Sequence, residues 1–366
     1  MQKSNDPALF WIGLSSIPGV GRVTFRKLAH HFGSPERALT ASQDELGTAG
    51  LSERMIADIA SFSWREYAEK ELVKAREAGV RIITVDDIAY PPALRNTPDP
   101  PLFLYIRGSL QHEDGVAIVG TRKPTHYGLT VTHRTAYELA AAGLTIVSGL
   151  ARGIDTQAHR GALAAKGRTI AVLGCGIDIV YPPENSDLLE RISVNGAVVT
   201  ENPFGTKPEA GYFPARNRII SGLSRGTVII EATEDSGSLI TANYTFEQGR
   251  KLFAVPGNIS SPNSRGTNSL IKRGAVLVEG SDDILRNLGI KPGTDQKRGM
   301  RPLPALTPDE ECVLSCISSE PGHIDAIMNE SLLAAGRLSG VLITLELKGL
   351  VKQLPGKYYV RGDEGR

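Results

Sequence analysis

The chain has 366 residues, which is enough for two or three domains of ordinary size. Apolar residues make up 41% of it and charged residues 22%, which excludes a generally disordered chain. The formal net charge is +1, so a nucleic acid or another polyanion has to be held by a local site and not by a global basic field.

The sequence also lacks the features of a membrane or secreted protein. No apolar run reaches the roughly 18 residues that a membrane-spanning helix needs, and the first residues contain no cleavage-like region, so we expect neither membrane insertion nor secretion. The three cysteines, Cys175, Cys312 and Cys316, are too few for a disulfide framework or a four-ligand zinc site. We therefore predict a cytoplasmic protein without a structural metal.

Residues 1–75 predict a small domain of short helices, which are expected near 22–31, 36–39, 44–46 and 51–61. The turn Ile17-Pro18-Gly19-Val20-Gly21 is typical of a helix-hairpin-helix, whose glycine amides and following helix can receive a backbone phosphate. A glycine turn in a plain helical bundle has the same pattern. Acidic and basic residues balance here, so both interpretations stay open.

Residues 76–290 predict a second domain in which short apolar strands alternate with helices. Strands are expected at 80–85, 116–119, 144–147, 169–173, 197–200, 227–230, 252–255 and 275–278, with helices such as 133–142, 156–165 and 244–249 between them. Continuous apolar strands of this kind indicate a parallel sheet buried on both faces. The fold class is therefore α/β, an extended Rossmann-like doubly wound sheet with ligands at the carboxyl ends of its strands.

Residues 291–305 predict a linker, and residues 306–366 a winged-helix domain. Glycine, proline and charge dominate the linker. Thr307 and Glu310 predict a capping box, and a hairpin is expected at 351–360 around Pro355-Gly356. The last 61 residues contain six basic and nine acidic side chains, whereas a module that reads a duplex groove presents a basic helix. We expect this domain to contact protein and not DNA.

Small residues, hydroxyls and arginines recur where the predicted strands end. Small residues allow a ligand to approach the backbone, helix N-termini suit anions, and arginines donate forked hydrogen bonds to phosphate. No dinucleotide fingerprint and no P-loop is present. Together the loops indicate a site for an extended polyanion or a nucleotide, made of Gly120, Thr121, Arg122, Lys123, Ser148, Gly149, Arg152, Gly153, Ser236, Gly237, Ser238 and Thr241.

The same segments do not predict a catalyst. The serines at the strand ends are candidate nucleophiles, but no histidine accompanies a nucleophile-elbow pattern, and His159 lies inside a predicted helix. The carboxylates at strand ends are interpreted as helix caps or arginine partners, namely Asp155, Asp178 and Glu231. We predict no catalytic residue, no metal and no cofactor.

The run from Pro214 to Ser224 is the densest feature of the chain. In a helix, Arg216 and Arg218 diverge by about 200°, so one can face a ligand while the other pairs inward. We favour Arg218 for the ligand, together with Asn217, and consider Glu231 as the inward partner of Arg216.

Several motifs in order resemble the DprA (Smf) DNA-processing family. They are Val119-Gly120-Thr121-Arg122, residues 148–155 with Ala158-His159, Tyr181-Pro182 with Asn185, residues 213–223, residues 236–242 and Val255-Pro256-Gly257. The resemblance covers roughly residues 80–280. It implies a protein that binds and protects single-stranded DNA during natural transformation and helps to load RecA on it. It also implies a Rossmann domain that forms a homodimer, and no known catalytic step.

The family's DNA pocket carries over onto Arg122 and Arg152, with Lys123 beside them. Arg168, at the start of a strand, and Asn217-Arg218 are further candidates. A base should stack on an aromatic side chain near this rim. The sequence leaves three choices open: Tyr127, Tyr181 and Phe213.

Two other functions remain as alternatives at this stage. Lysine-decarboxylase-like nucleotide phosphoribohydrolases share a Rossmann frame, but their Pro-Gly-Gly-x-Gly-Thr loop is absent, and Pro256-Gly257-Asn258 is the nearest run. A regulatory adaptor is the other alternative, because the acidic C-terminal domain suits an accessory protein contact.

Overall fold

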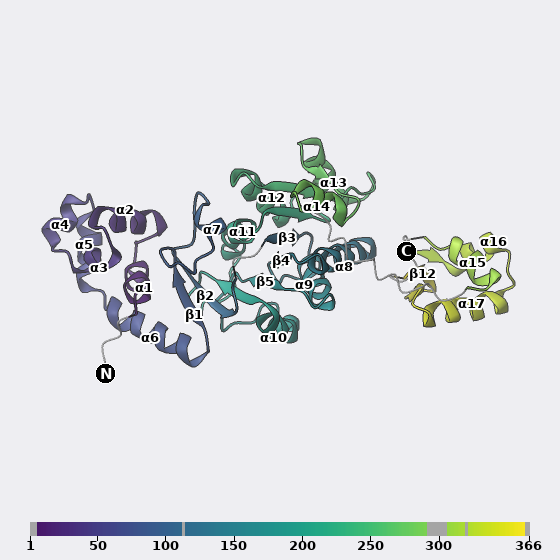
Figure 1. Cartoon of the computed structure of the whole chain (residues 1–366), viewed down its shortest axis with the longest axis horizontal. Helices are drawn as coiled ribbons and strands as arrows, with labels where there is room; N and C mark the ends of the chain where they lie inside the picture. The colour runs from purple at the N-terminus through teal and green to yellow at the C-terminus, as the bar shows by residue number, and fades with distance from the viewer. Residues whose placement is uncertain (1–5, 112–113, 291–305, 319–320, 363–366) are drawn as a thin grey trace.

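The computed structural model describes residues 6–111, 114–290, 306–318 and 321–362. In chain order its elements form a group of N-terminal helices, a nine-stranded sheet with helices on both faces, and a small C-terminal group (Figure 1). The predicted linker, residues 291–305, lies outside the described residues.

Six short helices form the N-terminal group: α1 Ala8–Ser16, α2 Arg22–Phe32, α3 Pro35–Thr40, α4 Gln43–Thr48, α5 Glu53–Ser61 and α6 Trp64–Glu77. Serines start three of them, since the side chains of Ser34, Ser42 and Ser52 each accept a hydrogen bond from the backbone three residues on. The α1–α2 turn needs a left-handed residue, which Gly19 supplies at φ 81°.

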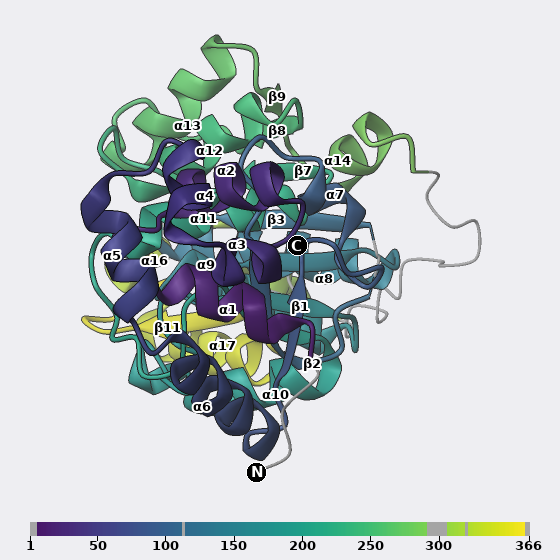
Figure 2. The ribbon, with the colours of Figure 1, turned by 90° about the vertical axis from the view of Figure 1, so that its left-hand side faces the viewer.

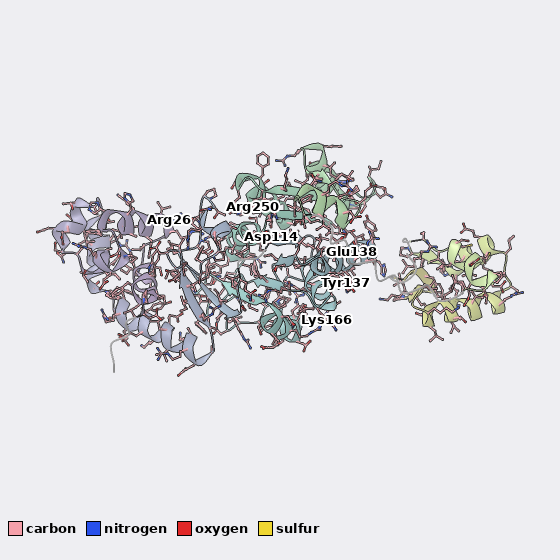
Figure 3. All side chains as sticks on the ribbon, in the orientation of Figure 1. Arg26, Asp114, Tyr137, Glu138, Lys166 and Arg250 are labelled. Atoms are coloured by element: carbon pink, nitrogen blue, oxygen red, sulfur yellow. The ribbon has the colours of Figure 1, made fainter. Side chains whose placement is uncertain are left out.

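The N-terminal helices pack directly on the sheet and share a hydrophobic core with it (Figure 2). Glu71 of α6 is buried, and its carboxylate accepts hydrogen bonds from the Tyr105 hydroxyl at 3.1 Å and from the Phe204 amide at 3.0 Å. Arg26 of α2 lies where this group meets the α/β body and forms an ion pair with Asp99 at 2.7 Å (Figure 3).

The large sheet has the strand order β1-β2-β6-β5-β4-β3-β7-β8-β9. The strands are β1 Arg81–Thr84, β2 Phe103–Gly108, β3 Gly115–Val119, β4 Thr145–Ser148, β5 Thr169–Val172, β6 Ala197–Thr200, β7 Gly226–Ile229, β8 Lys251–Ala254 and β9 Val276–Leu277. From β6 to β9 all neighbouring pairs are parallel, which confirms the doubly wound α/β fold.

One edge of the sheet differs from the prediction. The strand expected at 80–85 pairs antiparallel with β2, and β2, which pairs antiparallel with β6, was not predicted. A parallel crossover needs a dozen or more residues, usually with a helix long enough to cross the sheet. The β1–β2 connection, residues 85–102, is long enough for a crossover, but it contains only the four-residue helix α7, Pro92–Arg95, and the two strands pair antiparallel.

Helices cover both faces of the sheet because alternate strand residues point to opposite sides. Ala117 and Val119 of β3 pack in the core beneath α7, α11 Tyr212–Gly222, α12 Gly237–Glu247 and α13 Pro262–Lys272. Val116 and Ile118 pack in the core beneath α8 His126–Ala141, α9 Ile154–Ala164 and α14 Ser281–Asn287. The 3-10 turn Pro183–Asn185 leads into α10 Ser186–Asn195, which contacts β2, β5 and β6.

The topology defines where a ligand can enter. The chain proceeds from β3 through β4 and β5 to β6 in one direction, then returns to β7 on the other side of β3 and continues to β9. The loops after β3 and β7 therefore diverge and leave a crevice at the carboxyl edge of the sheet, as open doubly wound sheets do at their switch point.

The C-terminal group is a winged helix, as predicted. Its elements are α15 Pro308–Ser315, β10 Gly322–His323, α16 Ile324–Ser331, α17 Ala335–Leu347, β11 Val351–Leu354 and β12 Tyr358–Arg361. The capping box is confirmed, since Glu310 accepts from the Thr307 amide at 2.7 Å and Thr307 accepts from the Glu310 amide at 3.3 Å. Its core is separate from those of the large sheet.

Within the described residues no single helix has both the length and the apolar character to cross a membrane. One pair of helices, α16 and α17, passes that test jointly on length and composition, with a bend of 109° between them.

Candidate nucleic-acid interface

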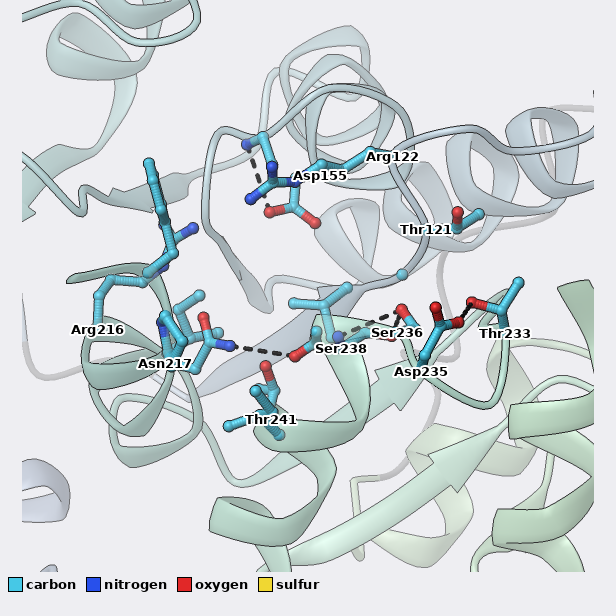
Figure 4. A pocket seen from close by; sticks show the side chains of 18 of the residues that line it. Thr121, Arg122, Asp155, Arg216, Asn217, Thr233, Asp235, Ser236, Ser238 and Thr241 are labelled. Atoms are coloured by element: carbon cyan, nitrogen blue, oxygen red, sulfur yellow. Dashed lines mark hydrogen bonds between the residues drawn. The ribbon is translucent and has the colours of Figure 1, made fainter. Parts of the chain in front are cut away.

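A cavity of about 770 Å³ occupies the crevice at the carboxyl edge of the sheet (Figure 4). One wall is the loop after β3, residues 120–123, and a second is the start of α11, residues 213–217. The third is the start of α12, residues 236–241. The structure thus brings together side chains from three loops that are up to about 120 residues apart in sequence.

The loop after β3 is held rigidly and presents two cations. The Thr121 amide donates to the Glu231 carbonyl at 2.8 Å, which ties this loop to the end of β7. A side chain on Gly153 would place its Cβ 2.6 Å from the Thr121 carbonyl, so only glycine fits that close approach. Arg122 and Lys123 are exposed above this support, and neither forms an ion pair with any residue that the structure describes.

Arg216 forms the floor of the cavity. It is buried, and its Nη1 donates to the carbonyls of Gly149, at 2.7 Å, and Val172. A Cβ on Gly149 would collide with the guanidinium, which accounts for the glycine there. The Arg216 Nε is buried without a hydrogen-bond partner. Burial lowers the pKa of Arg216 to about 10, so the side chain remains a cation at neutral pH.

Two buried carboxylates hold the loops in place, in line with their interpretation as structural groups. Asp155 accepts from the amides of Gly149 at 3.1 Å and Ala151 at 3.4 Å, which fixes the loop before α9. Burial raises the pKa of Asp155, while the nearby Arg216 acts in the opposite direction. Glu231 accepts from the backbone and hydroxyl of Thr125 at the start of α8, so it is not the partner of Arg216.

Arg216 and Arg218 point to opposite sides of α11, but in the reverse of the arrangement that we favoured. The Arg218 side chain is 3% exposed and lies outside the cavity, with its Nε 3.0 Å from Asp99 and its Nη2 2.6 Å from Glu201. Asp99 also pairs with Arg22 and Arg26 of α2. Arg218 therefore joins α11 to the N-terminal helices, and Arg216 is the arginine at the cavity.

The wall opposite Arg122 is built for hydrogen bonding. The Ser236 hydroxyl caps α12, accepting from the Ser238 amide at 3.4 Å and lying 2.8 Å from the Ser238 hydroxyl. The Asn217 amide donates to the Gly237 carbonyl at 3.3 Å, which links the two walls. Thr241 is almost fully buried and lines the cavity. The positive end of the α12 helix dipole favours an anion at this wall.

Besides Arg218, five predicted site residues do not line the main cavity: Gly149 and Gly153, described above, and Ser148, Arg168 and Arg152. The Ser148 hydroxyl is buried and donates to the Ile118 carbonyl at 2.7 Å. Arg168 precedes β5, so it lies at the amino edge of the sheet, where it donates to the Ser109 carbonyl at 2.6 Å. Arg152 lines a small hollow beside the main cavity and is paired with Glu184 at 2.5 Å.

Of the three aromatic candidates, Phe213 has the clearest position. Its ring lies in the cavity wall near the guanidinium groups of Arg122 and Arg216, whose carbon atoms are 5.4 and 5.9 Å from the ring centre. Tyr181 lies beside it, with ring centres 5.5 Å apart. Tyr127 lines a different cavity.

The sequence analysis missed two polar residues of the wall, Thr233 and Asp235, whose side chains hydrogen-bond to each other at 2.7 Å. Their position in the loop directly after β7 was a signal that could have found them, because that loop leads to Ser236.

These features define a class of protein: a Rossmann-like α/β domain with a cationic cavity at its switch point, joined to helical and winged-helix modules. The comparisons give the family. The family described as DNA recombination-mediator protein A matches residues 81–289, and the DprA winged helix domain matches residues 298–357. The chain belongs to the DNA recombination-mediator protein A family, also called DprA or Smf.

Relatives of known sequence and structure agree. Protein Smf of Synechocystis is 38% identical, covering 98% of this chain and all of that protein, and Protein Smf of Escherichia coli is 35% identical, covering 95% and 94%. The X-ray structure of DprA from Streptococcus pneumoniae matches with a TM-score of 0.56 at 34% identity, covering 73% of this chain and 98% of that one. A Helicobacter pylori DprA structure, described by its single-stranded DNA binding mode, matches with a TM-score of 0.52 at 34% identity, covering 57% and 95%.

Proposed function

We propose that this protein binds single-stranded DNA in the cavity at the carboxyl edge of its sheet, without sequence readout. The observation that carries the proposal is the position of Arg122, which is exposed at the cavity, forms no ion pair with the described part of the chain and lies over the ring of Phe213. An arginine there offers a forked donor to phosphate, and an aromatic ring offers a face to a base. The Helicobacter pylori relative, described by its single-stranded DNA binding mode, supports the same ligand class.

Each wall of the cavity has a distinct part in the proposal. Arg122 and Lys123 contact backbone phosphates, and the amides and hydroxyls at the start of α12 receive a second phosphate across the cavity. Phe213 stacks on a base, which is accessible only when the strand is unpaired. Arg216 stays bonded to Gly149 and Val172 and adds a fixed positive charge below.

The finer parts of the function rest on the family resemblance. We propose that the protein protects the bound strand, passes it to RecA and acts as a homodimer through residues 76–290, with no catalytic step of its own. The phosphoribohydrolase alternative gains no support from the geometry, because Gly257 and its neighbours do not line the cavity and Gly257 is hydrogen-bonded to Asn268 instead.

Fluorescence anisotropy with a labelled oligothymidine and a labelled duplex tests the proposal. Arg122→Ala should weaken single-strand binding by roughly 10- to 100-fold, because a charge-assisted hydrogen bond contributes about 1.5–3 kcal/mol. The matched control is Arg168→Ala, which removes an arginine at the opposite edge and should change affinity less than about twofold. Equal losses in the two variants, or equal affinity for single strand and duplex, would contradict the proposal.

A further inference from the structure

The exposed face of α17 in the winged helix carries an apolar stripe that no described residue covers. At 100° per residue, Gly336, Gly340, Ile343 and Leu347 fall within an arc of about 60°. Ile343 is 60% exposed and Leu347 85% exposed, and a Cβ added to either glycine would meet no atom within 4 Å. Leu338, Leu342 and Leu345 point into the core from the other face.

The charges beside this stripe are already engaged within the domain. Arg337 pairs with Asp309 at 2.5 Å, and Lys348 pairs with Glu310 at 2.7 Å. A helix that enters a duplex groove needs free cations for phosphate, and α17 has none among the described residues. Its surface suits an apolar helix of a protein partner.

We infer that α17 packs against α17 of a second copy of this chain, antiparallel about a two-fold axis. The first half of the stripe consists of glycines, and the second half carries large apolar side chains. An antiparallel pair centred between residues 341 and 342 places Gly336 opposite Leu347 of the other copy and Gly340 opposite Ile343. Each large side chain then faces a glycine, which is the knob-and-hole arrangement of closely packed helices. A two-fold interface requires such self-complementarity.

The size of the surface limits the strength of this pairing. A 13-residue helix is about 20 Å long and buries roughly half of the ~800 Å² per partner of a standard interface. The contact is therefore weak by itself, and the self-complementary order of glycines and large side chains is what favours a second copy as the partner. Because residues 306–366 carry an excess of acidic groups, the two copies repel one another, and salt strengthens this contact while it weakens DNA binding. The inference is independent of the proposed function and of the homodimer proposed for residues 76–290.

Sedimentation equilibrium of the full chain at low and high salt tests the pairing and its register. Gly340→Ile places two large side chains opposite each other, and Ile343→Gly leaves a cavity in the contact. Each variant should therefore raise the dissociation constant of one association step at least about tenfold. The double variant Gly340→Ile with Ile343→Gly exchanges knob and hole and should return to within about threefold of the natural chain. The matched control is Val194→Ser, which removes an equally exposed apolar side chain from α10 and should change nothing.

Loss of folding does not explain the expected result, because Gly340→Ile replaces a glycine of a helix interior at a position with open space around it. Circular dichroism melts of each variant confirm this independently. Association that is the same in all variants overturns the inference. So does a double variant that associates no better than the single ones, or a Leu347→Ser variant that loses DNA affinity while its association is unchanged.

Discussion

In the cavity of the α/β domain, Arg122 and Lys123 form no ion pair with any described residue and lie across the cavity from the N-terminus of α12. In the winged helix, Arg337 and Lys348 are bound by Asp309 and Glu310 of α15. Both regions have cations on or next to a helix or loop that could approach a nucleic acid. Of these four cations, only Arg122 and Lys123 are available to phosphate.

The comparison indicates that the surroundings of a cation determine whether it is available to a phosphate. The number of cations in a domain does not determine this. A net charge of +1 gives no reason to expect a nucleic-acid ligand, and the winged-helix fold alone would suggest one in the C-terminal domain. Arg216 is an intermediate case: it lines the cavity, but its Nη1 is bonded to the carbonyls of Gly149 and Val172, so it is first of all a structural cation.

The largest expected effect separates Arg216 from Arg122. Arg216→Ala leaves the carbonyls of Gly149 and Val172 without this donor and removes the positive charge near Asp155, so it should lower the free energy of unfolding by about 1–3 kcal/mol. Arg122→Ala should change it by less than about 0.5 kcal/mol, because this side chain is exposed. Urea unfolding followed by circular dichroism measures both. Similar losses of unfolding free energy in the two variants would contradict the description of Arg216 as structural and Arg122 as exposed.

The next effect concerns the ring of Phe213, which lies near Arg122 and Arg216. Phe213→Leu keeps an apolar side chain against Gly174 but removes the stacking face, so affinity for oligothymidine should fall roughly tenfold. Tyr127→Leu, in a separate cavity, is the control. Anisotropy titrations at one salt concentration compare the affinities of the two variants for oligothymidine. A loss of affinity confined to the Tyr127 variant would assign the stacking role to Tyr127.

A smaller effect is expected from the paired cation of the winged helix. Hydrogen bonding to the Lys348 ammonium holds the pKa of Glu310 below its ordinary value. A carboxyl group with a lowered pKa stabilises the fold at neutral pH, and this contribution is lost as the pH falls through the lowered pKa. Lys348→Met should therefore lower the melting temperature at pH 7 and make the melting temperature change less as the pH falls. The affinity for single-stranded DNA should stay within about twofold. A marked loss of affinity would show that Lys348 contacts DNA.

The smallest expected effect is the removal of the winged helix. A chain ending at residue 305 should bind a short oligothymidine within about twofold of the natural affinity, measured at protein concentrations too low for self-association. A loss comparable to that of Arg122→Ala would place part of the DNA interface in the C-terminal domain and erase the contrast between the two regions.

Much of this arrangement could be predicted from the sequence, and the remainder depends on contacts between distant segments. The run 197–200 was predicted with the bounds of β6, because buried parallel strands are continuous apolar runs. The residues after β3 and before α12 reach one cavity because carboxyl ends of parallel strands share an edge. Arg168 precedes its strand, so the same rule places it at the other edge.

The sequence could not decide which side of α11 faces the ligand. Helical periodicity gives the angle between Arg216 and Arg218, but not the rotation of the helix about its axis. That rotation is set by Asp99 and Glu201, which hold Arg218 from loops far away in sequence. β2 was missed for a different reason, because the apolar and aromatic run that starts at Phe103 is typical of a strand and the signal was present in the sequence.

The salt dependence of single-strand affinity tests the central claim most directly. If Arg122 contacts a phosphate, the slope of log K against log salt for oligothymidine should fall in magnitude by about 0.7 in Arg122→Ala. It should stay unchanged in Arg337→Ala, whose cation is already paired with Asp309. A slope that is the same in the natural chain and in Arg122→Ala, or one that falls only in Arg337→Ala, would contradict the assignment of DNA binding to the cavity.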